Sequence, residues 1–231
     1  MDISRIRALR GPNLWSRHTA IEAVVACEPQ ERSLTQMTGL EARLRALFPS
    51  LGPLRRQPEQ ASLAHVLELA TLALQAQAGC PVSFSRTTPT VEEGVYQVVI
   101  EYTEEDVGRK ALRFAEALVQ AALSADGTFD ADAAVRELRE LDEDVRLGPS
   151  TGSIVNAAVA RGIPFRRLTQ GSLVQFGWGS KQRRIWAAEV DSTSAVSESI
   201  AQDKDLTKTL LRAAGVPVPL GRPVEIGRAH V

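Results

Sequence analysis

The sequence predicts an α+β protein in two parts, and three observations lead to this fold class. Apolar residues recur at helical spacing in some stretches of the 231 residues and at the two-residue spacing of strands in others. The strands of the first part are grouped between helices and do not alternate with them one by one. A segment rich in glycine and proline, residues 148–152, then separates residues 1–148 from the rest. We therefore expect a small mixed α/β domain followed by a second unit.

In the first part, residues 19–27 alternate apolar and polar side chains and predict a strand. Leucines and a methionine at helical spacing predict a helix over residues 34–48. Further helices are predicted for residues 62–78, 104–124 and 130–145, and strands for residues 82–86 and 95–103. Asp130 is the expected N-cap of the last of these helices.

The second part begins with a predicted short helix over residues 153–161. Three short strands are then predicted, for residues 165–168, 172–176 and 182–188. A long helix is predicted for residues 193–214, and a final extended strand for residues 216–219. Gly177-Trp178-Gly179 forms a tight turn, and Gly215 ends the long helix. We expect both tryptophans near this turn, Trp178 and Trp186, to pack in the core or the turn.

The composition is ordinary for a soluble globular protein, with 44% hydrophobic and 24% charged residues. Cys27 and Cys80 lie far apart without a CxxC pair, which argues against a disulfide framework or a thiolate metal site and favours the cytoplasm. The sequence shows neither the apolar region of a signal peptide nor a membrane span.

The net charge of −1 conceals an asymmetry along the chain. Residues 1–60 carry +3, residues 91–148 carry −9 and residues 149–231 carry +5. The basic final part could face phosphates, whereas the acidic middle would repel a nucleic-acid backbone. We therefore do not expect nucleic acid as a partner.

Three stretches of the second part carry a family resemblance. They read SLVQFGWGSKQRRIWA from Ser172, TSAVSESIAQDKDLTKTLL from Thr193, and AGVPVPLGR from Ala214. The first part adds RGPNLWS from Arg10, LELATLALQAQAG from Leu67, and VVIEYTEEDVGRKA from Val98. With these motifs the chain resembles, over residues ~5–225, the cyanophycin synthetases, bacterial ligases that build a poly-aspartate backbone carrying arginine side chains. Bifunctional glutathione synthetases share similar motifs throughout the second part, SxVQLGxG followed by DK…K…AGVPVP, but residues 1–148 do not resemble their glutamate–cysteine ligase module.

The resemblance implies that residues 149–225 are the incomplete start of an ATP-grasp domain, which needs ATP and Mg2+, with the metal ligands expected in the missing part. It implies cyanophycin primer, L-aspartate and L-arginine as partners, and a homo-oligomer when the protein is full length. ATP would activate the carboxylate at the end of the polymer as an acyl phosphate, which the amine of aspartate attacks. We expect residues 226–231, IGRAHV, to be a non-native tail, and we expect the fragment to be inactive alone.

By resemblance, Lys204 and Lys208 would contact ATP; they lie four residues apart, on one helical face. Ser172 would hold the terminal carboxylate of the polymer, and Arg183 is a further substrate-binding candidate. Arg183 and Arg184 alternate along a strand, so only one of them can face a site. The alternatives are a solvated helix face for the lysines and a plain hairpin for the serine.

His65 and Glu68 share a helix face and have the spacing of two metal ligands, which leaves a metal-dependent hydrolase as a third hypothesis. Leu69 stands where the family pattern has a second histidine, so we predict no metal site. A binding module for the polymer or for a partner protein is the second hypothesis. Its acidic candidates, which could instead stabilise a helix N-terminus, are Glu101, Glu104, Glu105 and Asp106.

Overall fold

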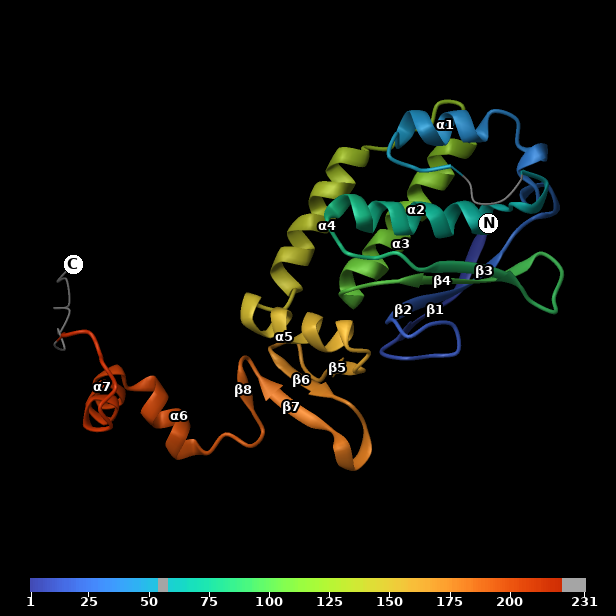
Figure 1. Cartoon of the computed structure of the whole chain (residues 1–231). Coiled ribbons are helices and arrows are strands. Elements are labelled where there is room, and N and C mark those ends of the chain that lie inside the picture. Colours follow the sequence, from blue (N-terminus) through green and yellow to red (C-terminus); the bar gives the residue numbers. More distant parts are fainter. Residues whose placement is uncertain (54–57, 222–231) are drawn as a thin grey trace.

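Two separate antiparallel sheets organise the chain (Figure 1). The computed structural model describes residues 1–53 and 58–221. The first sheet has the strand order β1-β2-β4-β3 and the second has the order β5-β6-β7-β8. Within the described residues the chain also forms seven α-helices. The α+β expectation is thus confirmed as a mixed architecture, and the predicted tail at residues 226–231 lies outside the described residues.

The first sheet forms the larger part of the molecule. It contains β1 (Asp2–Leu9), β2 (Ala20–Ala26), β3 (Ser85–Pro89) and β4 (Val95–Glu101). Two helices, α2 (Leu63–Ala78) and α3 (Glu105–Leu123), cover one face, while α1 (Leu40–Leu47) packs on α3 and α4 (Ala131–Val145) packs on both α2 and α3. Their inward side chains form one continuous core, in which the largest buried members include Ile21, Phe48, Leu67, Leu74, Ile100, Leu112 and Leu138.

Two helix ends show the local chemistry that starts or stops a helix. The Asp130 carboxylate accepts a hydrogen bond of 2.8 Å from the Ala133 N–H and caps α4. Gly79 ends α2 with a φ of 102°, a left-handed conformation that glycine adopts without a steric penalty. Helices α2, α3 and α4 therefore lie where the apolar periodicity places them.

Two elements of the first part differ from expectation. The predicted helix over residues 34–48 is split, because Gly39 has a φ of 77° and α1 begins only at the next residue. The strand predicted for residues 82–86 is shifted to β3. The reason is that the N–H groups of Ser83 and Phe84 donate to the carboxylate of Glu101, at 2.8 Å each, and not to a neighbouring strand.

The sequence pattern did not predict β1. A register shift lies between Ile3 and Arg5, which are the Cα partners of Val25 and Val24, so Ser4 is an extra residue in the strand. The extra residue interrupts the alternation of apolar and polar side chains by which a strand is recognised. Several basic residues on this exposed edge strand further weaken the pattern.

The second sheet contains β5 (Phe165–Arg167), β6 (Leu173–Phe176), β7 (Arg183–Trp186) and β8 (Glu189–Val190). Helix α5 (Pro149–Ala160) lies against it and begins earlier than predicted, because Pro149 occupies the first helical position, where its missing N–H costs nothing. The core here is small. Its fully buried members are Val155, Val174 and Ile185.

The predicted long helix over residues 193–214 is two helices, α6 (Ala195–Gln202) and α7 (Lys204–Ala213). Asp203 separates them, because its carboxylate accepts from the N–H groups of Asp205 and Leu206 and thereby starts α7. Both helices extend away from the two sheets (Figure 1), and neither contains a buried residue. The strand expected over residues 216–219 does not form.

Short 3-10 helices complete the described structure at Pro29–Glu31, Leu34–Gln36, Pro58–Gln60 and Gly179–Lys181. Across the ranges 1–53 and 58–221, no helix combines the length and the apolar character that a membrane crossing requires.

Candidate functional site

Ser172 lies directly before β6 and is half-buried. Its carbonyl oxygen accepts a hydrogen bond of 3.2 Å from the N–H of Ala187. The carbonyl of Ala187 in turn accepts a 3.0 Å bond from the hydroxyl of Thr151, a residue that is 2% exposed. The backbone at Ser172 is therefore held through the β7–β8 turn and α5. Among the contacts of the described residues, none uses the Ser172 hydroxyl, so this hydroxyl is available to a ligand.

The two arginines of β7 lie on opposite faces of the second sheet. Arg184 is the Cα partner of Gln175, whereas Arg183 is the partner of Phe176, whose side chain belongs to the small core. Arg183 is exposed. Its strand partner Phe176 lies four residues after Ser172, which is about 13 Å at the rise of a strand. The two predicted substrate-binding residues, Ser172 and Arg183, are thus on the same strand pair but not side by side.

Arg166, Gln175 and Arg184 form a row across three neighbouring strands. The amide nitrogen of Gln175 donates to the carbonyl of Gly177 at 3.2 Å, which ties this side chain to the turn after β6. The sequence analysis considered Arg184 but not Arg166, because the pairing of β5 with β6 was needed to bring Arg166 into this row.

Lys204 and Lys208 lie on α7, one turn apart. Lys204 is the first residue of the helix and is exposed, whereas Lys208 is half-buried, with its Nζ 3.0 Å from where a Cβ at Gly221 would lie. In Figure 1, α7 is well separated from the second sheet. The structure therefore does not bring the two predicted nucleotide ligands together with Ser172.

The described residues do not form a magnesium site. Across the ranges 1–53 and 58–221, no three side chains of His, Cys, Asp or Glu gather closely enough to hold a metal ion. The ammonium groups of Lys204 and Lys208 suit phosphate oxygens. Asp203 and Asp205 flank Lys204 along the chain, and the Asp203 carboxylate is engaged in capping α7.

His65, the candidate metal ligand of the third hypothesis, has a structural role. Its Nδ1 lies 3.1 Å from the backbone N of Ser62 and 2.9 Å from the Ser62 hydroxyl, an arrangement that caps the start of α2. The imidazole also packs edge-on against Tyr96, with ring centroids 5.7 Å apart. Glu68 is buried on the same helix, but no third ligand accompanies the pair in the described part of the chain.

The acidic residues proposed to grip arginine side chains already have partners within the chain. Glu101 accepts from the two amides before β3 and lies 3.0 Å from the His18 Nδ1. Glu104 pairs with Arg167 at 2.8 Å. Glu105 pairs with two arginines, Arg10 and Arg109, and their hydrogen bonds lower its pKa despite partial burial. These three carboxylates thus have partners within the chain, and these partners are not the N–H groups at the start of α3.

Neither Trp178 nor Trp186 packs in the core, which was one of the two places predicted for them. Trp186 is 68% exposed on the solvent face of β7, and Trp178 is 47% exposed. The ring of Trp178 lies near Gly11 of the first part, 3.8 Å from where a side chain there would begin. Trp178 thus contributes to the contact between the two parts of the chain.

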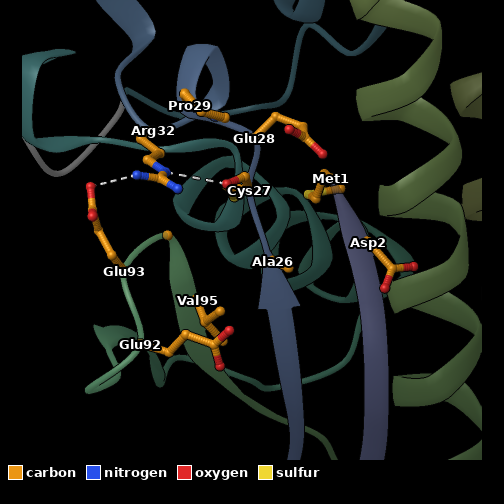
Figure 2. A pocket seen from close by; sticks show the side chains of 11 residues that line it. Met1, Asp2, Ala26, Cys27, Glu28, Pro29, Arg32, Glu92, Glu93 and Val95 are labelled. Carbon is orange, nitrogen blue, oxygen red and sulfur yellow. Dashed lines mark hydrogen bonds and ion pairs between the residues drawn. The ribbon is translucent and has the colours of Figure 1, made fainter.

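A cavity of about 430 Å³ lies in the first part and was not predicted (Figure 2). Its lining mixes charged and apolar residues and includes Arg32, which donates to Glu93 at 2.6 Å and to the Cys27 carbonyl at 3.3 Å. The cavity lies at the Asp2 and Val95 end of the first sheet, whereas the second sheet contacts the opposite end, beyond Glu101. It was missed because its lining comes from three separate segments.

Comparisons with known proteins agree with the resemblance drawn from the motifs. Residues 23–124 match the model of the cyanophycin synthase-like N-terminal domain. Cyanophycin synthetases of Trichormus variabilis and of a Nostoc species are each 38% identical to the chain over 238 residues, which is 96% of this chain and 26% of each relative. The cyanophycin synthetase of Geminocystis herdmanii is 37% identical over 239 residues, 96% of this chain and 27% of the relative. The chain thus spans about a quarter of the length of these relatives.

Proposed function

We propose that this chain, a relative of the cyanophycin synthetases over nearly all of its length, acts within an ATP-dependent ligase that joins aspartate and arginine into cyanophycin. The observation that carries this proposal is the 38% identity over 96% of the chain, which includes both sheets as well as α6 and α7. The matched proteins are about four times as long, so the activity belongs to the whole protein.

In this proposal, the Ser172 hydroxyl donates a hydrogen bond to the carboxylate at the end of the growing polymer. Its backbone is held from both sides while the hydroxyl stays available, as a binding serine requires. Arg183 contributes positive charge at the other end of the same strand pair, where it can meet a second group of an extended chain. The roles of both residues are proposals that await the experiment below.

Lys204 and Lys208 are proposed to contact the phosphates of ATP. The nucleotide would supply the phosphoryl group that activates the polymer carboxylate, and Mg2+ would be held by residues outside the described chain. Two ammonium groups on one helix face offer directed donors to phosphate oxygens. Helix α7 lies apart from the second sheet, which carries Ser172 at the start of β6. We therefore propose that the two lysines and Ser172 form one site only in the assembled ligase.

The test is polymer synthesis by the protein as its gene encodes it, supplied with primer, ATP, Mg2+, aspartate and arginine. We expect both amino acids to enter an insoluble polymer, and we expect synthesis to stop when ATP or Mg2+ is withheld. Ser172→Ala should raise the KM for primer by roughly 10- to 100-fold, because a hydrogen bond to a charged group is worth about 1.5–3 kcal/mol. The matched control is Ser180→Ala, an exposed serine in the next turn.

Absence of incorporation with primer present would refute the ligase proposal. Incorporation of glutamate, cysteine and glycine instead would favour the alternative, a ligase of the bifunctional glutathione synthetase kind. Reading the gene beyond the codon for Val224 provides an independent check, since a P-loop followed by a Mur-ligase-like domain is expected there.

A second candidate function is a polymer-binding module in residues 1–148. The family model matches residues 23–124 by themselves, and the core around α2 and the first sheet is drawn from residues 21–138. Residues 1–148 should sediment with cyanophycin granules, and salt should weaken the binding because exposed charge pairs are screened. Failure to bind at low ionic strength would remove this candidate.

A further inference from the structure

The guanidinium of Arg167 joins the two parts of the chain through one side chain. Its Nη1 donates to the Glu104 carboxylate at 2.8 Å and to the Val145 carbonyl at 2.6 Å. Its Nε donates to the Gly171 carbonyl at 2.9 Å, and its Nη2 donates to the carbonyl of Gln170. One residue of β5 thereby satisfies acceptors at the start of α3, at the end of α4 and in the β5–β6 turn.

Within residues 1–53 and 58–221, Arg167 is the hydrogen-bond partner of both the Glu104 carboxylate and the Val145 carbonyl. The carbonyl of Val145 belongs to the last turn of α4, where no further helical N–H follows to bond it. Glu104 is the N-cap residue of α3 but does not cap the helix with its side chain, which points to Arg167 instead. Arg167 therefore bonds the side chain of the α3 N-cap residue and a terminal backbone carbonyl of α4, at the contact between the two parts.

The pair lies in a poorly solvated seam. The side chains of Arg167 and Glu104 are 20% and 17% exposed. Burial raises the pKa of Glu104 even though Arg167 favours its charged form. In such surroundings, removing one partner leaves the other charge inadequately solvated, which costs more than the loss of an exposed ion pair.

The turn that Arg167 holds leads directly to Ser172. Gln170 and Gly171 are the two residues before this serine, and the Leu168 N–H closes the turn by donating to the Leu173 carbonyl at 2.9 Å. We propose that Arg167 and Glu104 are positioning residues that fix the turn before Ser172 against the first part of the chain. The first part then sets the geometry of the proposed carboxylate site without contacting the ligand. This role at Ser172 rests on the function proposed above, whereas the fixing of the turn does not.

Hydrogen exchange of residues 1–231 tests the fixing of the turn. In Arg167→Met, the amides of Leu168 and Gly171 should exchange about tenfold faster or more, because unsatisfied buried groups cost about 1–3 kcal/mol. The amides of α2 should keep their protection. The matched control is Arg166→Met, since Arg166 is the neighbouring arginine, is exposed and lies on the opposite face of β5.

If Arg167→Met does not fold, Glu104→Gln and Arg167→Lys can test the proposal in its place. Both should raise exchange in the turn by less than Arg167→Met does. Unchanged exchange in the turn would overturn the proposal, and so would equal acceleration in the turn and in α2, because that result assigns Arg167 a purely global stabilising role.

In the full-length ligase, Arg167→Met should raise the KM for primer severalfold and leave the KM for ATP unchanged, with Arg167→Lys restoring part of the loss. A ligase that makes no cyanophycin would refute the proposed function but leave the exchange result intact. Faster exchange in the turn without any change in the KM for primer would refute the positioning of Ser172 alone.

Discussion

At the scale of single residues, Glu22 shows how this fold buries a charge. Its side chain on β2 is 2% exposed. It accepts from the Nε of Arg7, from the amide of Gln97 and from the indole of Trp15 at 3.3 Å. Burial opposes ionisation, but these donors outweigh it, so the pKa of Glu22 falls below its ordinary value of 4.5. The Glu22 carboxylate thereby links β2 to Trp15, to Arg7 of β1 and to Gln97 of β4.

Glu22→Gln should lower the free energy of unfolding at neutral pH by about 1–3 kcal/mol, because its donors lose a charged acceptor. A lowered pKa stabilises the folded state fully above the ordinary value, and this contribution is lost as the pH falls through the folded value. The unfolding free energy of the wild type should therefore decline more steeply than that of the variant as the pH falls below 4.5.

Urea denaturation at a series of pH values measures this difference. Glu140→Gln, at an exposed position on α4, serves as the control and should follow the wild type at every pH. Parallel curves for Glu22→Gln and the wild type would show that the network does not hold the carboxylate in its charged form.

At the scale of elements, α3 packs so closely on Tyr102 and on β2 that one of its positions requires glycine. A Cβ at Gly108 would lie 2.7 Å from the Tyr102 Cβ and 3.2 Å from the Ile21 Cγ1. The Tyr102 Cβ is fixed by its own backbone, so the helix itself would have to move. Gly108 thus determines how near α3 approaches the first sheet.

Gly108→Ala should destabilise the protein, because overpacking costs about 1–3 kcal/mol and exceeds the gain of up to about 1 kcal/mol in helix propensity. Gly152→Ala in α5 is the matched control. The atom nearest to a Cβ there is the Leu147 carbonyl oxygen at 3.6 Å, so only the favourable helix propensity remains. Chemical denaturation of both variants measures the difference, and a stabilised Gly108→Ala would contradict the close packing.

At the scale of the whole molecule, the two parts differ in how well they are buried. The first part has one large continuous core, whereas the core cluster of the second part contains three buried residues among those that the structure describes. Apolar side chains of α7 remain exposed, among them Leu206 at 41% and Leu210 at 45%. Strand β5 is also an edge strand of its sheet. The second part therefore presents surfaces that favour self-association.

We expect residues 1–231 to be less soluble than residues 1–148, as measured by light scattering at increasing concentration. Replacing Leu206 and Leu210 with serine should recover part of the solubility, because it removes apolar area without touching the first core. Equal solubility of the two lengths would contradict this expectation.

The sequence by itself determined which segments are helices or central strands, since periodicity, the Asp130 cap and the Gly79 terminator act locally. It also carried the family resemblance, because motifs such as SLVQFGWG remain recognisable without a fold. It failed at β1, at Gly39 and at Asp203, where a bulge, a left-handed residue and a cap interrupt an otherwise regular pattern.

Only the tertiary structure decided which side chains meet. Glu104 was a candidate for gripping the polymer until its distance to Arg167, 63 positions along the chain, showed that it already has a partner. Arg166 joined the row with Gln175 only through strand pairing, and Ser172 and Lys204 proved to lie apart. Contacts between residues distant in the sequence depend on strand register and on the packing of whole elements, and neither is written in the local spacing of residues.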